Sequence, residues 1–290
     1  MAAILFPVFA QAKAAAKKTA GLSNAKQIGT STAIYLNDND DTMPNSVYRY
    51  FGGWYPGLIT PCPADVVANG GWNDPGLIES GKNIVGNSIL IYTKNQDIFD
   101  VPGATRVNIG DVFNGTPTPS NLTFNGDMSQ LNSSAVDSPS VAVLWWGGQG
   151  TTTVMGRTAA NPQLNCQDPT QDSCRWNNGG PPQSGLPDGL NDFFFGYNNF
   201  DPSYVPYFYG HGVAFVHADT SAKWRRVGNV ESTTSYSVSC ETDPFAQVFK
   251  DSTGYEFTYF TASRGDVHDC SADVAPWQYV GYFRPDKTIE

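Results

Sequence analysis

The chain lacks the sequence motifs by which most enzymes and metalloproteins are recognised. No His-Glu-x-x-His, Gly-x-Ser-x-Gly, P-loop or Rossmann glycine pattern occurs in its 290 residues. Histidine occurs three times, and no two cysteines have the Cys-x-x-Cys spacing of a zinc site. We therefore expect a protein without catalytic activity.

Acidic residues are absent from the first thirty-six positions, which hold four lysines: Lys13, Lys17, Lys18 and Lys26. The whole chain has a net charge of −10, so the remaining residues carry −14. An acidic surface argues against nucleic acid or an anionic membrane as the partner. Charged residues make up only 15% of the chain and aromatic residues 13%, which favours a surface that packs against neighbours.

No apolar run reaches the ~20 residues that a membrane-spanning helix needs. The N-terminal apolar stretch covers only Ala2 to Phe9. No basic segment precedes it and no small-residue cleavage site follows it, so it does not have the pattern of a signal peptide. We expect it to be the end of a longer apolar helix whose upstream part is missing.

A long helix is predicted for the first thirty-six residues. Alanine, which has the best helix propensity, fills most of positions 10–20. Small and apolar side chains then recur every three or four residues and predict one buried face, which holds Leu22, Ala25, Gly29, Thr32 and Leu36 and is widened by Ile28 and Tyr35. The helix should end near Asn37, because the side chains of the following Asn/Asp run compete for backbone hydrogen bonds.

The rest of the chain is predicted to form short strands between long loops. β-Branched and aromatic residues cluster at Ser88–Tyr92, Val141–Trp146, Val213–His217, Ala222–Val227, Ser235–Cys240, Tyr255–Ala262 and Gln278–Phe283. Nine aromatic residues lie between positions 193 and 209. We interpret that segment as a loop folded on its own aromatic core, and the alternative is an exposed contact surface.

Several motifs resemble those of one protein family. The stretch from Ala2 to Lys13, followed by Leu-Ser-Asn-Ala-Lys-Gln-Ile-Gly, resembles the second half of the N-terminal helix of type IV pilin-like proteins, which include pilins and type II secretion pseudopilins. Segments 89–102, 138–146 and 211–224 resemble segments that lie further along the chain in the large-bodied bacterial branch of this family. The last of them departs from the family pattern, because seven residues separate His211 from Asp219 and Thr220 replaces a glycine.

The resemblance implies an α+β, pilin-like fold in which a long N-terminal helix packs on an antiparallel β-sheet with large loops. We expect a helical stalk (1–36), a globular β domain (37–230) and a β-rich C-terminal extension (231–290). The implied function is a structural subunit that polymerises into an extracellular filament on a bacterial cell surface. Its other partner would be the assembly machinery, with an inner-membrane pool held through the missing upstream residues before assembly.

Two alternatives remain at this point. The first is a type II secretion pseudopilin, and the second is a secreted, Ca²⁺-dependent carbohydrate-binding module. In the filament hypothesis, the subunit contacts are the apolar residues Ile4, Leu5, Phe6, Pro7, Val8 and Phe9. We also expect Lys13, Lys17 and Lys18 to face acidic patches on adjacent subunits.

The remaining candidate sites are disulfides, a cation site and glycosylation sequons. Disulfides Cys166–Cys174 and Cys240–Cys270 are predicted for an oxidising compartment, with Cys62 free, although spacing alone does not fix the connectivity. Oxygen ligands at Asp38, Asp40 and Asp41 suit Ca²⁺, the only cofactor indicated, but we favour a solvated turn at the helix end. The same three aspartates are candidate partners for the lysines. Sequons occur at Asn114, Asn121 and Asn132.

Overall fold

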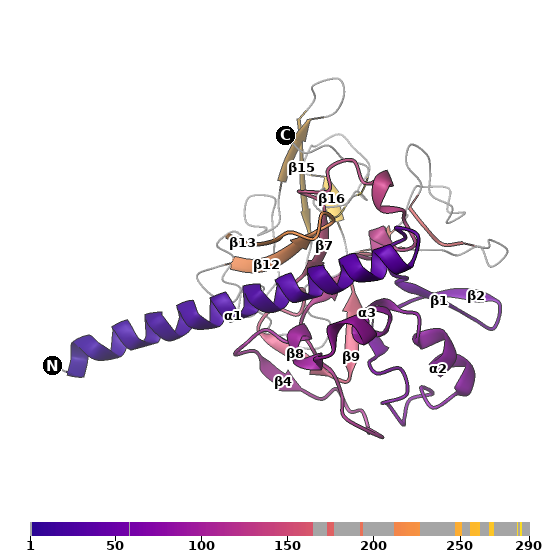
Figure 1. Cartoon of the computed structure of the whole chain (residues 1–290), viewed down its shortest axis with the longest axis horizontal. Helices are drawn as coiled ribbons and strands as arrows, with labels where there is room; N and C mark the ends of the chain where they lie inside the picture. Colours follow the sequence, from indigo (N-terminus) through magenta and orange to yellow (C-terminus); the bar gives the residue numbers. More distant parts are fainter. Residues whose placement is uncertain are drawn as a thin grey trace.

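The structure is a computed structural model, and it describes residues 2–57, 59–164, 173–176, 192–193, 212–226, 247–250, 256–261, 267–269, 283 and 285. Mixed helix and antiparallel sheet confirm the α+β class. Figure 1 shows a long N-terminal helix that crosses the body with its second half and projects from it with its first half.

The long helix α1 (Ala2–Asp38) ends where the sequence predicts. Its last turn is closed by Leu36, whose carbonyl accepts hydrogen bonds from the Asn39 amide at 3.1 Å and the Asp41 amide at 2.9 Å. Asp40 and Asp41 have φ values of 50° and 56°. Short polar side chains such as Asp tolerate this left-handed conformation, so the aspartates serve as the turn that ends the helix.

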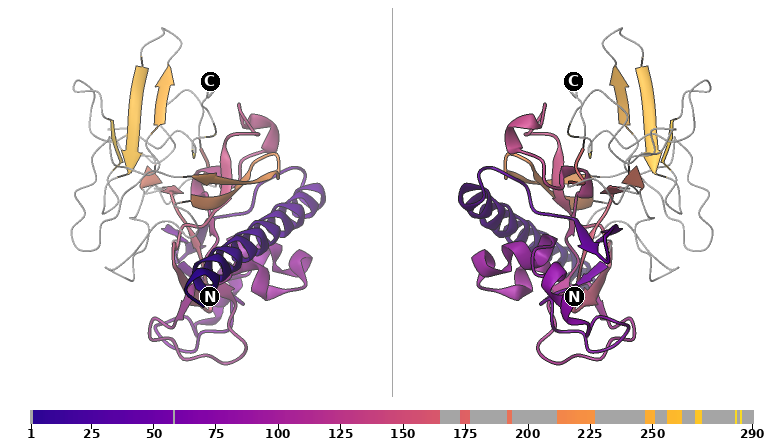
Figure 2. Two further views of the ribbon diagram at one scale, coloured as in Figure 1. Left: turned by 90° about the vertical axis from the view of Figure 1, so that its left-hand side faces the viewer. Right: turned by 90° about the vertical axis from the view of Figure 1, so that its right-hand side faces the viewer.

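The main sheet has six strands, and α1 lies across one of its faces (Figures 1 and 2). Every neighbouring pair is antiparallel except β6 and β9, which are parallel. Their spatial order is β13 (Ala222–Arg226), β12 (Gly212–His217), β7 (Val143–Trp146), β6 (Thr123–Phe124), β9 (Arg157–Ala160) and β3 (Ile59–Pro61).

Two adjacent tryptophans on the central strand β7 organise the core on both faces of the sheet. Trp145 faces α1, where its Nε1 donates a hydrogen bond to Oγ1 of Thr32 at 3.1 Å. Trp146 points the other way, as strand alternation requires, and its ring packs 5.1 Å from that of Phe283. Both tryptophans are fully buried, so α1 and Phe283 cover opposite faces of this strand.

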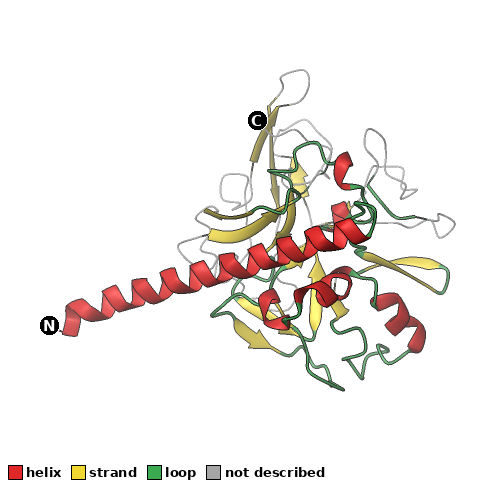
Figure 3. Cartoon of the chain, in the orientation of Figure 1, coloured by secondary structure: helices red, strands yellow, loops and turns green. Residues whose placement is uncertain are grey.

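Smaller elements surround the main sheet (Figure 3). The helical ones are α2 (Pro75–Gly81), α3 (Val85–Thr93), η1 (Gln96–Phe99), η2 (Gly126–Met128) and η3 (Ser133–Ala135). Four small sheets pair β1 (Val47–Tyr50) with β2 (Gly53–Pro56), β8 (Thr152–Met155) with β4 (Thr105–Val107) and β5 (Pro119–Ser120), β10 (Gln163–Leu164) with β11 (Asp192–Phe193), and β15 (Glu256–Thr261) with β14 (Gln247–Lys250) and β16 (Val267–Asp269).

One predicted strand is wrong. Residues Ser88–Tyr92 lie in helix α3, not in a strand. Val85 and Ile89, four residues apart, are buried on one helical face, and the ring of Tyr92 meets that of Tyr35 on α1 edge-on at 6.0 Å. A short apolar run has no periodicity that separates a strand from a buried helix, so packing against α1 decides the conformation.

The other predicted strands are found where they are described. Strands β7, β12, β13 and β15 match the expected positions within two residues. The predicted strand 235–240 lies outside the described residues, as does 278–283 apart from Phe283. The proposed domain boundary at residue 230 also falls there, whereas the end of the stalk coincides with the end of α1 to within two residues.

Candidate functional site

The first half of α1 is the part of the molecule that differs most from an ordinary globular surface. Phe6, Val8 and Phe9 are 74%, 59% and 70% exposed, and Pro7 between them is also exposed. Ile4 and Leu5 belong to the same helix, but their side chains lie outside the described part. Figure 1 shows this segment standing clear of the body, so its apolar side chains have no packing partner in the described chain.

The second half of α1 is docked on the body by close backbone contact. Ala25, Ile28, Gly29, Thr32 and Leu36 are buried along one face, as the spacing predicts, whereas Leu22 is only half-buried and the neighbouring Gly21 is buried. At Gly29 an added Cβ would lie 2.7 Å from the carbonyl oxygen of Thr220 and 2.9 Å from Cγ1 of Val216. Only glycine permits this approach, which sets the helix directly on the β12–β13 turn.

The β12–β13 hairpin corresponds to the motif that departs from the family pattern. Thr220 has a φ of 62°, so it adopts the left-handed conformation for which a glycine would be better suited. Asp219 accepts a hydrogen bond from the Ser221 amide at 2.9 Å, as expected of a turn aspartate. His217 is buried with Nδ1 2.8 Å from the carbonyl oxygen of Val141, and burial lowers its pKa. These contacts are structural.

The lysines of α1 differ in their surroundings. Lys18 lies over the indole ring of Trp224, with Nζ 3.2 Å from the ring centroid, and Lys26 donates a hydrogen bond to the carbonyl oxygen of Thr220 at 3.1 Å. Lys13 is exposed and Lys17 half-buried. Within the subunit, Lys18 and Lys26 therefore help to hold the helix on the hairpin.

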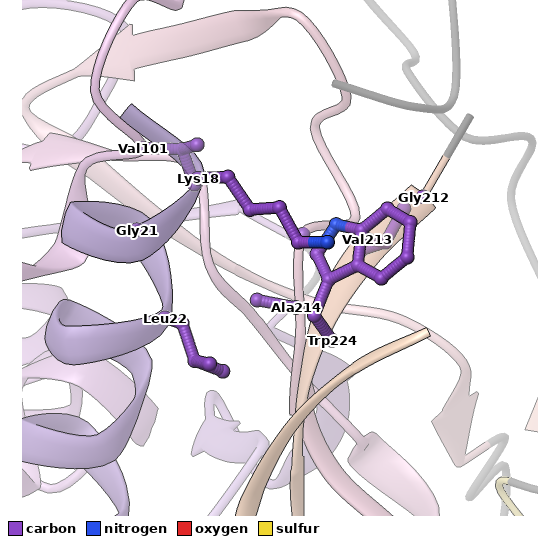
Figure 4. Close-up of a pocket in the computed structure, with 9 residues that line it drawn as sticks. Lys18, Gly21, Leu22, Val101, Gly212, Val213, Ala214 and Trp224 are labelled. Carbon is purple, nitrogen blue, oxygen red and sulfur yellow. The ribbon is translucent and has the colours of Figure 1, made fainter. Parts of the chain in front are cut away.

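A small pocket lies beside the contact between Lys18 and Trp224, where α1 leaves the body (Figure 4). It is lined mainly by apolar groups: Leu22, Val101, Val213, Ala214 and Trp224, together with Lys18 and three glycines. Its volume of about 20 Å³ holds little more than one water molecule. Such a pocket is too small for a substrate or cofactor of ordinary size.

The structure does not bring Asp38, Asp40 and Asp41 together as a cation site. Among the described residues there is no group of three or more His, Cys, Asp or Glu side chains able to hold a metal ion. Asp38 instead accepts a hydrogen bond from the Tyr92 hydroxyl at 3.0 Å, and the Asp40 carbonyl accepts one from Nδ2 of Asn132 at 3.2 Å. The aspartates fit a turn that joins α1 to the body.

The cysteine predictions are only partly within the described residues. Cys62 is a free, buried thiol, as expected, and desolvation raises its pKa to about 12. Cys174 is buried and disulfide-bonded. Cys166, Cys240 and Cys270 lie outside the described residues, so the two predicted pairings stay predictions.

The sequons are not equivalent. Asn121 is fully buried, and its Nδ2 donates to the carbonyl oxygen of Gly150 at 2.6 Å, so this nitrogen is inaccessible to a glycosylating enzyme. Asn132 is exposed, but its Oδ1 accepts hydrogen bonds from the backbone and side chain of Ser134. Asn114 is exposed on a loop and remains a candidate acceptor.

An aromatic cluster on the β1–β2 hairpin is not among the features predicted from the sequence. Tyr48 and Tyr55 pair across the two strands with stacked rings 5.6 Å apart, and Tyr48 also meets Trp72 at 6.1 Å. Tyr50 contacts Tyr55 at 6.4 Å and Phe51, at the tip, at 4.3 Å. The sequence does contain a signal for this hairpin. Aromatic residues at Tyr48, Tyr50, Trp54 and Tyr55 flank the turn residues Phe-Gly-Gly.

This cluster is firmly attached to the body. Trp72 lies over the guanidinium of Arg157, 5.4 Å from ring centroid to Cζ, and Arg157 forms a buried ion pair with Asp111 through Nε–Oδ2 at 2.6 Å. The tip of the β1–β2 hairpin has an unusual backbone conformation and an exposed ring. Phe51 is 88% exposed and has a φ of 47°, a conformation that costs a bulky residue about 1–3 kcal/mol.

Comparisons with known proteins find no matching family model, no matching curated protein and no matching solved structure. No helix in the described part of the chain is long and apolar enough to cross a membrane.

Proposed function

We propose that the protein is a structural subunit that polymerises through α1 into an extracellular filament of the type IV pilin-like kind. The observation that carries the proposal is the exposure of Phe6, Val8 and Phe9 on a helix that projects from its body. Fully burying one such side chain is worth ~1.5–3 kcal/mol. A contiguous apolar helical surface of this kind favours association with further helices.

The charge distribution supports the same arrangement. Lys13 and Lys17 lie on the projecting part of a helix without acidic residues, whereas the rest of the chain is strongly acidic. Packed helices would therefore present lysines to the acidic bodies around them. Lys18 contributes less to such contacts than the sequence predicts, because it already lies over Trp224. The assembly machinery, the bacterial cell surface and an inner-membrane pool before assembly are parts of this proposal.

The test is to place charge in the apolar segment of the full chain. The double variant Ile4→Asp/Phe6→Asp should remain folded and lose polymerisation, because burying unpaired charge costs several kcal/mol. The matched control Gln27→Asp/Thr30→Asp adds the same two charges to exposed positions on the docked half of α1. Negative-stain microscopy and sedimentation then compare the three chains. Normal filaments from the Ile4/Phe6 variant would overturn the proposal.

A further inference from the structure

Asparagine followed directly by glycine occurs four times in the chain, at residues 69–70, 114–115, 125–126 and 178–179. This pair is chemically special. Glycine has no Cβ, so its main-chain nitrogen can reach the side-chain amide of the preceding asparagine with little steric hindrance. The first three pairs belong to the described residues, and the fourth lies outside them. Because the surroundings of the three pairs differ, their reactivity should differ as well.

The side chain of Asn69 is held at both ends of its amide group. Its Nδ2 donates a hydrogen bond to the carbonyl oxygen of Gly110 at 3.0 Å. Its Oδ1 accepts one from the Val112 amide at 2.8 Å. The amide group of Asn69 therefore cannot turn toward the following main-chain nitrogen unless both hydrogen bonds break.

Asn125 is held more firmly still, because it is fully buried. Its Nδ2 donates hydrogen bonds to the carbonyl oxygens of Val143 and Phe283, both at 2.7 Å. The nitrogen that would attack this side chain is also engaged, since the Gly126 amide donates to the carbonyl oxygen of Pro162 at 2.8 Å. Neither reacting group of this pair is available in the folded chain.

The Asn114–Gly115 pair is the opposite case. Asn114 and Gly115 are exposed, and within the described chain no hydrogen bond holds the Asn114 side chain or the Gly115 amide. The loop is anchored on either side, by the Asn114 amide on the Val66 carbonyl oxygen at 2.8 Å and by the Thr118 amide on the Cys62 carbonyl oxygen at 3.0 Å. Its tip can therefore bring the two reacting atoms to the ~3–3.5 Å that a reaction needs without disturbing the body.

We propose that Asn114 is a site of spontaneous covalent modification, at which asparagine is converted to a mixture of aspartate and isoaspartate. The main-chain nitrogen of Gly115 attacks Cγ of Asn114, and the new C–N bond closes a succinimide ring. The side-chain nitrogen leaves as ammonia and takes up the proton that the Gly115 nitrogen loses. Water then opens the ring at either of its two carbonyl groups. The net change is hydrolysis of the amide, with no oxidant or cofactor.

The modification has two consequences for the surface of the body. A carboxylate replaces a neutral amide, so an already acidic surface gains one negative charge at this loop. The Asn114-Gly-Thr sequon is destroyed at the same time, so the modification and a glycan exclude each other at this position. The inference is independent of the proposed function and holds whether or not the chain polymerises.

Peptide mapping of the purified full chain, incubated at mildly alkaline pH, tests the proposal. In the native chain, aspartate and isoaspartate should accumulate about tenfold faster at position 114 than at positions 69 and 125, where hydrogen bonds must break first. In denaturant the three positions should react at similar rates, because the fold causes the difference. A native rate at position 114 no higher than that at position 69 would overturn the inference.

Two variants of the loop separate this reaction from glycosylation. Gly115→Ala adds a Cβ that meets no atom within 4 Å, at a residue without positive φ, so its melting temperature should not change. Its modification should be about tenfold slower, because the methyl group hinders the attack. The control Thr116→Ala removes the sequon and keeps the Asn-Gly pair, so it should react like the wild type. Loss of the modification in Thr116→Ala, or an unchanged rate in Gly115→Ala, would overturn the inference.

Discussion

The two halves of α1 have the same conformation and opposite surroundings. From Gly21 onward the helix buries one face against β12, β13 and α3, with Ile28 fully buried and Trp145 bonded to Thr32. From Phe6 to Lys13 its side chains are exposed, although Phe6 and Phe9 are as apolar as anything in the core. Helices in water gain most of their stability from packing of an apolar face. This contrast is the reason for proposing that the first half packs against another copy of the chain.

The largest expected effect comes from truncating one apolar side chain in each half of α1 and comparing the results. Ile28→Ala should lower the free energy of unfolding of the monomer by about 2–5 kcal/mol, because it empties a fully buried site. Phe9→Ala should leave monomer stability nearly unchanged and weaken assembly. Chemical denaturation and sedimentation measure the two properties separately. Equal loss of monomer stability in both variants would remove the distinction between the halves.

Substitutions of Gly29 and Gly21 test how closely the docked half of α1 packs on the body. Gly29→Ala should destabilise the body by about 1–3 kcal/mol, because the new Cβ would press on the Thr220 carbonyl. At Gly21, by contrast, an added Cβ would lie 3.6 Å from Cγ1 of Val101, an ordinary contact. Gly21→Ala should therefore stabilise the helix by up to ~1 kcal/mol. Thermal melts of both variants provide the measurement, and the same sign for both would contradict this packing.

The smallest effect concerns the lysine at the junction of the two halves. Lys18→Gln should cost ~0.5–1 kcal/mol of monomer stability, because it removes the cation from the face of Trp224. Lys13→Gln, at an exposed position, should leave the monomer unchanged and reduce assembly only at low ionic strength, where exposed charges are least screened. Denaturation and salt-dependent sedimentation separate the two lysines. If Lys13→Gln destabilised the monomer as much as Lys18→Gln, the intramolecular role of Lys18 would be wrong.

Sequence patterns predict the elements whose local chemistry agrees with their packing. The buried stripe from Ala25 to Leu36 and the end of α1 are confirmed, as are the β12–β13 hairpin and the strand with Trp145 and Trp146. Residues 88–92 fail because an apolar run fits either a strand or a helix until its neighbour, Tyr35, is known.

The candidate site was less predictable for similar reasons. The pattern places Lys18 on a helix but does not reveal that Trp224, two hundred residues later, lies beneath its ammonium group. The three aspartates at the end of α1 have the composition of a cation site. In the structure, however, Asp40 and Asp41 form a turn with positive φ values, and Asp38 accepts a hydrogen bond from Tyr92. The turn at Phe51 was not predicted because phenylalanine is an unusual residue at a position with positive φ.

Amide hydrogen exchange, followed residue by residue along α1 in the monomer and in the assembled state, tests the central claim most directly. In the monomer, amides before Gly21 should exchange rapidly and those from Ala25 to Leu36 slowly, because only the second group is supported by packing. In the assembled state, both groups should exchange slowly. Protection of the first half in the monomer, or its continued rapid exchange after assembly, would contradict the claim that this half is the assembly surface.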